Sequence, residues 1–84
     1  MPPPQSDATL LPMRLTVRFD RETDGRWIAT VPELPGVHVY GASRDAALSK
    51  AVALSYSVLA DEVEHGERDA RTLLTLTFET PEAA

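Results

Sequence analysis

In RWIATVPELPGVHVYGAS, residues 26–43, two strand-like runs are separated by two prolines and a glycine. Side chains alternate over residues 27–31, which is typical of a β-strand. Pro32 ends this strand because proline has no N–H to donate to a neighbouring strand. Pro35 and Gly36 form a natural turn pair, since glycine tolerates a positive φ. We therefore expect a stiff corner between the two strands.

This corner has two interpretations that the sequence leaves open. It is either a purely structural turn that leads the chain into the next strand, or a contact surface that exposes Glu33 and Leu34 to a partner. On the second interpretation, the candidate partner-binding residues are Pro32, Glu33, Leu34, Pro35 and Gly36.

The flanking sequence predicts further elements on both sides of the corner. Upstream, MRLTVRFD (13–20) alternates as a half-buried strand, and the Asp24-Gly25 pair favours a hairpin turn. Downstream, Ser43 is a good N-cap for a helix over residues 44–64, whose apolar stripe has helical spacing. TLLTLTFE (72–79) is expected to be a last strand with Leu74, Leu76 and Phe78 facing inward. The stripe comprises Leu48, Ala51, Val52, Ser55, Val58, Leu59 and Val63.

The order of these elements predicts a two-layer α+β fold, β-β-β-α-β. A right-handed crossover would place the last strand beside the first and parallel to it. This gives a four-stranded mixed sheet of order 3-2-1-4 with one helix on one face. The other face is mostly polar and is either solvated or a subunit interface. The candidate interface residues on that face are Arg14, Thr16, Arg18, Ile28 and Leu73.

Length and composition indicate a single small domain. The chain has 84 residues, no cysteine and a net charge of −5. We expect a flexible tail at residues 1–9, one domain over residues 10–80 and a short tail at residues 81–84. An acidic chain is unsuited to a broad phosphate-binding surface, which needs clustered basic residues. With no targeting segment or apolar run of membrane-spanning length visible, we expect a cytoplasmic protein without membrane contact.

No group of residues indicates catalysis or a cofactor. DRETDG (20–25) matches the opening of a calcium loop, but Val31 occupies the position that needs a bidentate glutamate, so a charged turn is favoured. His38 and His65 lie 27 positions apart and are weak evidence for zinc. We therefore predict no catalytic, cofactor-binding or metal-binding residues and no enzymatic activity.

The corner and its flanks together resemble the HicB-like antitoxin family. The resemblance rests on an aromatic-x-A-x-V-P-[DE]-L-P-G run, matched by residues 27–36, followed by Gly41 and a helix capped by Ser43. It covers residues 15–64, and the last strand extends it to Phe78. In this chain Val37 follows the P-G pair, and Ala46 replaces the acidic capping-box residue, which predicts a slightly weaker cap.

Membership would imply a partial ribonuclease-H-like fold and a role in neutralising a small basic HicA-type ribonuclease toxin. The inward positions of the first and last strands are apolar, so we expect no metal-dependent nuclease activity. We also expect no direct DNA binding by this chain. The alternative is a solitary homo-oligomeric protein of the same fold, a dimer or tetramer with a structural or regulatory role and no toxin partner.

Overall fold

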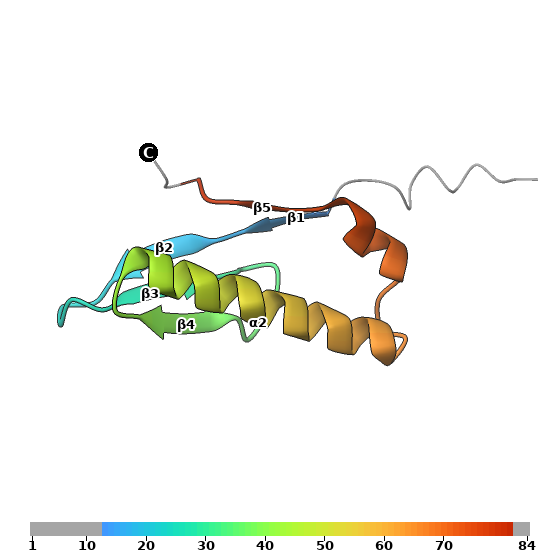
Figure 1. Ribbon diagram of the computed structural model, residues 1–84, viewed down its shortest axis with the longest axis horizontal. Coiled ribbons are helices and arrows are strands. Elements are labelled where there is room, and N and C mark those ends of the chain that lie inside the picture. Colours follow the sequence, from blue (N-terminus) through green and yellow to red (C-terminus); the bar gives the residue numbers. More distant parts are fainter. Residues whose placement is uncertain (1–12, 82–84) are drawn as a thin grey trace, which may run out of the picture.

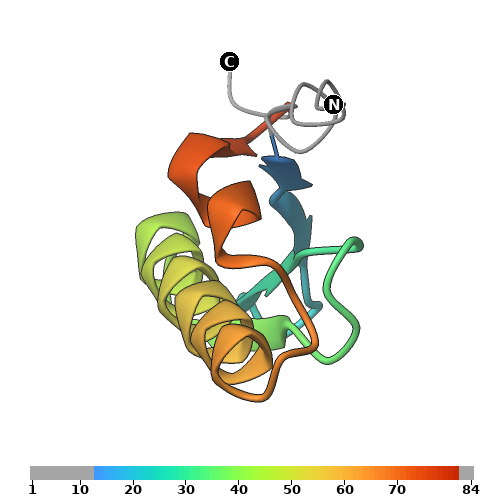
Figure 2. The ribbon, with the colours of Figure 1, turned by 90° about the vertical axis from the view of Figure 1, so that its right-hand side faces the viewer.

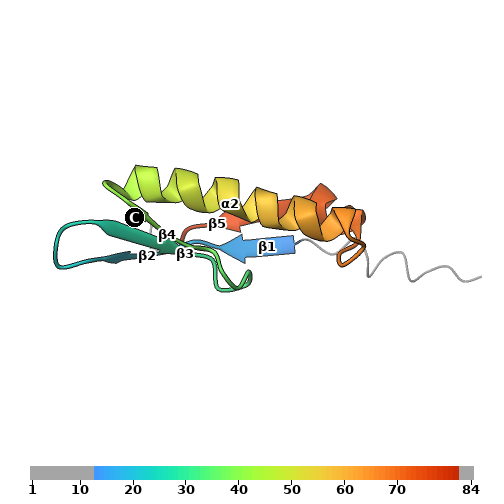
Figure 3. The ribbon, with the colours of Figure 1, turned by 90° about the horizontal axis from the view of Figure 1, so that it is seen from below.

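Strands and one long helix form two layers in the computed structural model, which describes residues 13–81 (Figure 1). The helix lies on one side of the strands (Figures 2 and 3). The chain therefore has the predicted α+β class. The elements, in chain order, are β1 (Met13–Thr16), β2 (Arg18–Arg21), β3 (Trp27–Thr30), β4 (His38–Gly41), α2 (Arg44–Glu64), the 3-10 helix η1 (Ala70–Thr75) and β5 (Leu76–Glu79).

Parts of the predicted domain plan lie outside the described residues. These are the N-terminal tail (1–9), the first residues of the domain (10–12) and the C-terminal tail apart from Pro81. Within residues 13–81, neither helix combines the length and apolar character needed to cross a bilayer.

The strands form two sheets, so the predicted single four-stranded mixed sheet is wrong. β1 pairs with β5 in parallel, whereas β2, β3 and β4 form an antiparallel sheet. The predicted first strand is divided at Val17 into β1 and β2, which have different neighbours. Val17 is fully buried, and its N–H donates to the Glu79 carbonyl at 2.8 Å. The division arises because β3 ends at Thr30, opposite Arg18, so that within residues 13–81 no strand lies on that side of β1.

The helix α2 begins after the predicted cap, Ser43, and covers the predicted residues 44–64. Ser43 Oγ accepts a hydrogen bond from the Ala46 N–H at 3.0 Å, which satisfies one of the unpaired donors of the first turn. After His65, Gly66 has a φ of 72°, the left-handed conformation that commonly ends a helix.

The buried line of α2 is narrower and made of smaller residues than the predicted stripe. It comprises Ala47, Ala51, Ser55 and Leu59, each four residues after the last. The Ser55 hydroxyl is satisfied locally, because it donates to the Ala51 carbonyl at 2.7 Å. The larger apolar residues Leu48, Leu54 and Val58 pack at the sides of the core. Small side chains along this line allow the helix to approach the sheet closely.

The closest approach is at Gly41, at the end of β4. A Cβ atom there would lie 2.4 Å from the Ala47 nitrogen and 2.8 Å from its Cα. These are backbone atoms of the first turn of α2 and cannot move aside as a side chain can. Gly41 thus fixes the contact between α2 and the antiparallel sheet, where the helix packs on β3 and β4.

The segment after α2 differs from the prediction. The expected strand over residues 72–79 is a 3-10 helix up to Thr75 and a strand only from Leu76. Leu74, which was expected to face inward, is 77% exposed, whereas Leu73 packs against the core. The cause is local: Asp69 caps the turn and its carbonyl accepts from the Thr72 N–H at 3.0 Å, which starts the 3-10 helix.

We predict that Gly41→Ala destabilises the fold by about 2–3 kcal/mol, because the added methyl group meets rigid backbone. Gly66→Ala is the matched control. It adds the same methyl group where no atom lies within 4 Å. Its loss of stability, about 1 kcal/mol, comes only from placing alanine at a positive φ. Chemical denaturation of both variants gives the comparison. Equal losses of stability would contradict the assigned role of Gly41.

Candidate functional site

The proline corner between β3 and β4 consists of two successive β-turns. The Leu34 N–H donates to the Val31 carbonyl at 3.0 Å and closes the first turn. The Val37 N–H donates to the Leu34 carbonyl at 3.1 Å and closes the second. Pro32 and Pro35 each occupy the second position of their turn, where the fixed φ of proline fits. Both prolines therefore stiffen one compact loop.

Gly36 allows the second turn to close. Its φ is 96°, which a residue with a side chain rarely adopts. Pro35 followed by a glycine at positive φ is the pattern of a type II turn. The prediction of a turn at this pair is confirmed.

Leu34 lies at the point shared by the two turns and faces the core. Only 2% of its surface is exposed, and it belongs to the same buried cluster as Leu15, Val17 and Leu59. The prediction that the corner exposes Leu34 is wrong, because the reversal between the two turns directs this side chain inward. The other four candidate partner-binding residues are exposed: Pro32, Glu33, Pro35 and Gly36.

Glu33 attaches the corner to β1. Its Oε1 accepts from the Thr16 backbone N–H at 3.0 Å, and its Oε2 accepts from the Thr16 hydroxyl at 2.8 Å. The carboxylate thus occupies the side of β1 where no strand pairs with it. A side chain here replaces the carbonyl that a neighbouring strand would supply.

The surroundings of Glu33 favour its charged form. Partial burial acts to raise the pKa, but the hydrogen bonds from the Thr16 N–H and hydroxyl and the charge of Arg18 outweigh it. The net result is a pKa below the ordinary value of 4.5. Glu33 is therefore an anion held in a fixed position at neutral pH.

The candidate subunit-interface residues do not share one surface. The strand register places Arg14, Thr16 and Arg18 on the face away from the helix. Ile28 lies between Asp20 and Tyr40 on that face but is only 7% exposed. Leu73 is part of η1 and packs against the core cluster instead.

The calcium-like segment forms a charged hairpin turn. Asp24 Oδ1 accepts from the Arg26 N–H at 3.0 Å, and Oδ2 lies 2.8 Å from Arg26 Nε. The backbone hydrogen bond contributes most to lowering the pKa of Asp24. Gly25, with a φ of 94°, completes the turn. Both oxygens of the Asp24 carboxylate are therefore bound to Arg26 within the turn.

The two histidines lie in separate parts of the chain. His38 Nδ1 is 3.0 Å from the Thr30 hydroxyl, while His65 Nδ1 is 2.8 Å from the Asp61 carbonyl. Among residues 13–81, no three side chains of the metal-ligating types come together. No pocket is found in the structure of these residues either.

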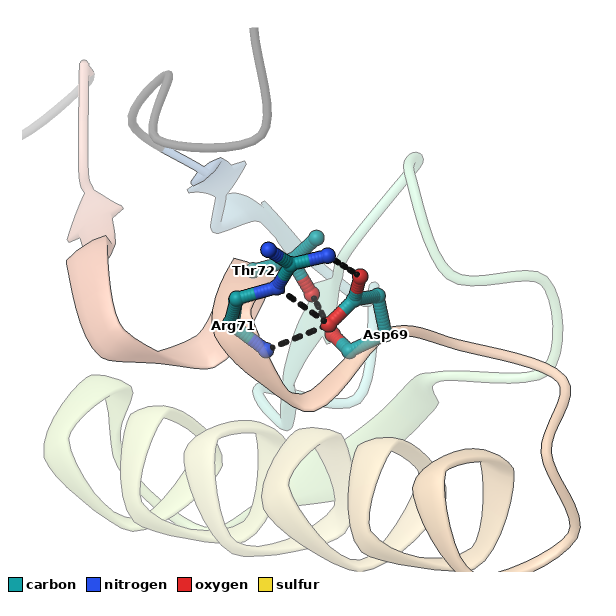
Figure 4. Close-up of polar contacts among 3 residues, drawn as sticks. All are labelled: Asp69, Arg71 and Thr72. Carbon is teal, nitrogen blue, oxygen red and sulfur yellow. Dashed lines mark hydrogen bonds and ion pairs between the residues drawn. The ribbon is translucent and has the colours of Figure 1, made fainter. Parts of the chain in front are cut away.

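A further polar cluster caps η1. Asp69 accepts from the Arg71 N–H at 2.9 Å and from Arg71 Nη2 at 2.7 Å, and the Thr72 hydroxyl donates to the Asp69 carbonyl at 2.7 Å (Figure 4). The side-chain hydrogen bonds from Arg71, followed by its backbone N–H, lower the pKa of Asp69 to about 2. All of these contacts lie within four successive residues, so we assign the cluster a structural role. Aspartate is a favoured N-cap residue, so the type of residue 69 could have indicated this turn, which was not predicted from the sequence.

Comparison with protein-family models, curated proteins and solved structures finds no match to this chain. The corner, with its four exposed residues, among them the Glu33 that binds Thr16, is the candidate functional site.

We predict that Leu34→Ala costs about 2–5 kcal/mol of stability, because it removes a fully buried side chain. Pro35→Ala, in the same loop but exposed, should cost about 1 kcal/mol or less. Urea denaturation of the two variants gives the comparison. A loss below 1 kcal/mol for Leu34→Ala would contradict its place in the core.

We predict that Glu33→Gln lowers stability at pH 7 by about 1 kcal/mol or less, because the carboxylate is exposed. Since the pKa of Glu33 is lowered on folding, the unfolded chain binds more protons between the two pKa values. The advantage of the wild type is therefore full above pH 4.5 and is lost as the pH falls through the lower, folded value. Denaturation at several pH values measures this difference, and Thr16→Val tests the same contact from the donor side. A constant difference from pH 7 to pH 2 would contradict it.

Proposed function

We propose that this chain is a HicB-like antitoxin-type binding protein that neutralises a small basic HicA-type ribonuclease toxin. The observation that carries the proposal is the placement of the V-P-E-L-P-G motif. It forms a double turn between two antiparallel strands, followed by Gly41 against the helix and by the Ser43 cap. This is the order of features on which the resemblance to the family rests.

The corner supplies a rigid surface for a protein partner. Pro32 and Pro35 are exposed, and their turns are closed by backbone hydrogen bonds. Glu33 is held between them by Thr16. A surface that is ordered before binding loses little conformational entropy when it meets its partner.

The acidic end of α2 supplies a second region that suits a basic partner. Glu64 and Glu67 are exposed, and no ion pair joins either of them to another described residue. The last turn of α2 contains no basic residue, although the negative end of the helix dipole favours one. A cationic surface of a partner would be attracted both to these carboxylates and to the negative end of the helix dipole.

Charge also explains how binding could neutralise such a toxin. A ribonuclease that is basic attracts the phosphates of RNA through its lysine and arginine residues. A chain with a net charge of −5 is attracted to the same surface. Bound there, it would exclude the RNA by occupying its site.

We expect Glu64→Gln/Glu67→Gln to weaken binding to a catalytically inactive HicA-type toxin about 10-fold, because the variant removes two charges that attract the basic surface. The matched control is Ser49→Lys/Ala53→Lys. It changes the net charge by the same two units on exposed positions nearer the start of α2. Isothermal titration calorimetry at two salt concentrations provides the affinities.

The two variants separate a local contact from a general charge effect. Equal weakening by both would show that only net charge matters and would contradict a contact at the end of α2. Failure of the wild-type chain to bind or neutralise any such toxin in co-expression would overturn the proposed function.

A further inference from the structure

β5 is the outermost strand on its side of the structure. Among the strands of residues 13–81 it pairs with β1 alone, and β4 forms the opposite edge (Figure 1). The backbone groups on the outer side of β5 are therefore available to another strand.

The hydrogen bonds of β5 determine which of its groups face outward. The Glu79 carbonyl accepts from Val17, so the backbone of Glu79 faces β1. Because the backbone alternates along a strand, Thr77 also faces β1, whereas Leu76, Phe78 and Thr80 face away. The Leu76 N–H is already used, since it donates to the Leu73 carbonyl. The outward groups to which no described residue is hydrogen-bonded are thus the Leu76 carbonyl, both backbone groups of Phe78 and the Thr80 N–H.

Apolar side chains accompany this edge. Tyr56 of α2 is 53% exposed, and its ring packs edge-on against Phe78 with 5.6 Å between the centroids. Leu74, two residues before the start of β5, is 77% exposed. The helix packs on β3 and β4, so it leaves this side of the molecule half covered.

The edge also lacks the features that usually prevent strand pairing. β5 contains no lysine or proline, and its one charged residue is Glu79. Glu79 lies 3.6 Å from Arg14 of β1, so the two charges offset each other locally. This strip is neutral in a chain whose net charge is −5.

We propose that β5 pairs antiparallel with the β5 strand of a second copy of this chain, around a two-fold axis at Phe78. In this register the Phe78 N–H of each copy donates to the Phe78 carbonyl of the other. Each Thr80 N–H donates to the opposite Leu76 carbonyl. All four hydrogen bonds use groups that are free, and none needs the occupied Leu76 N–H.

The side chains support the same register. The two Phe78 rings lie opposite each other, each with Tyr56 packed beside it, and cross-strand aromatic pairs are favourable. On the other face, Thr77 lies opposite Glu79 of the second copy, so no like charges meet. A second copy is the occupant that this edge fits. A two-fold pairing requires a surface complementary to itself, and the hydrogen-bonding groups and side chains of β5 match those of another β5 in this register. This interface differs from the sheet face suggested by the sequence, and it does not depend on the proposed toxin.

The test is sedimentation velocity of the full chain between roughly 1 µM and 1 mM, a range suited to a small interface. We expect a reversible dimer. Thr77→Glu places like charges opposite each other at two symmetric positions and should weaken the dimer on the order of 10-fold. Within one chain the new glutamate lies beside Arg14, so the fold is not harmed. Thr77→Gln, the matched control, has a similar size without the charge and should leave the dimer unchanged.

Thr80→Pro provides a second test, since it removes the N–H needed for pairing while no hydrogen bond from that N–H to a described residue is present. It should weaken the dimer strongly while leaving circular dichroism and melting unchanged. A monomer throughout the concentration range would overturn the proposal. So would a dimer that Thr77→Glu and Thr80→Pro leave unchanged, or an edge that binds an extended peptide but never a second copy.

Discussion

The absence of an N–H group on Pro32 is the constraint from which the rest of the arrangement follows. It stops β3 at Thr30, so the first extended segment loses its neighbour halfway along. The Thr16 N–H would then be unpaired, at a cost comparable to a lost hydrogen bond. The same loop that causes the loss also returns Glu33 to Thr16 and repairs it. The proline corner therefore both interrupts the pairing of the strands and supplies the hydrogen bond that replaces it.

The end of β3 at Thr30 also determines which strands the helix covers. Because β1 pairs with β5 and β2 with β3, the strands form two offset sheets rather than one. The helix is tied to the antiparallel sheet through Gly41 and Ala47, so it covers β3 and β4 most closely. The partial exposure of Tyr56 follows from that placement.

Local signals in the sequence were sufficient for the helix and the turns. Ser43, Gly25 and Gly36 act through their own hydrogen bonds or φ angles, and such effects depend little on the rest of the chain. Long-range outcomes were not predictable in the same way. The inward direction of Leu34, the contact between Glu33 and Thr16, and the division at Val17 all require the path of a second segment. Alternation alone also suggested a strand at residues 72–75, where the Asp69 cap favours a 3-10 turn.

The pairing of β1 with β5 has a consequence for the order of folding events. Met13 lies beside Leu76, so β1, the first described strand, can pair only after β5, the last one, is in place. Contacts this distant in sequence raise the contact order and slow folding relative to local contacts. The β2–β3 hairpin and α2 can form from local contacts, whereas the parallel pair can close only once β5 has been synthesised. Until then Leu15 and Val17 lack part of their cover.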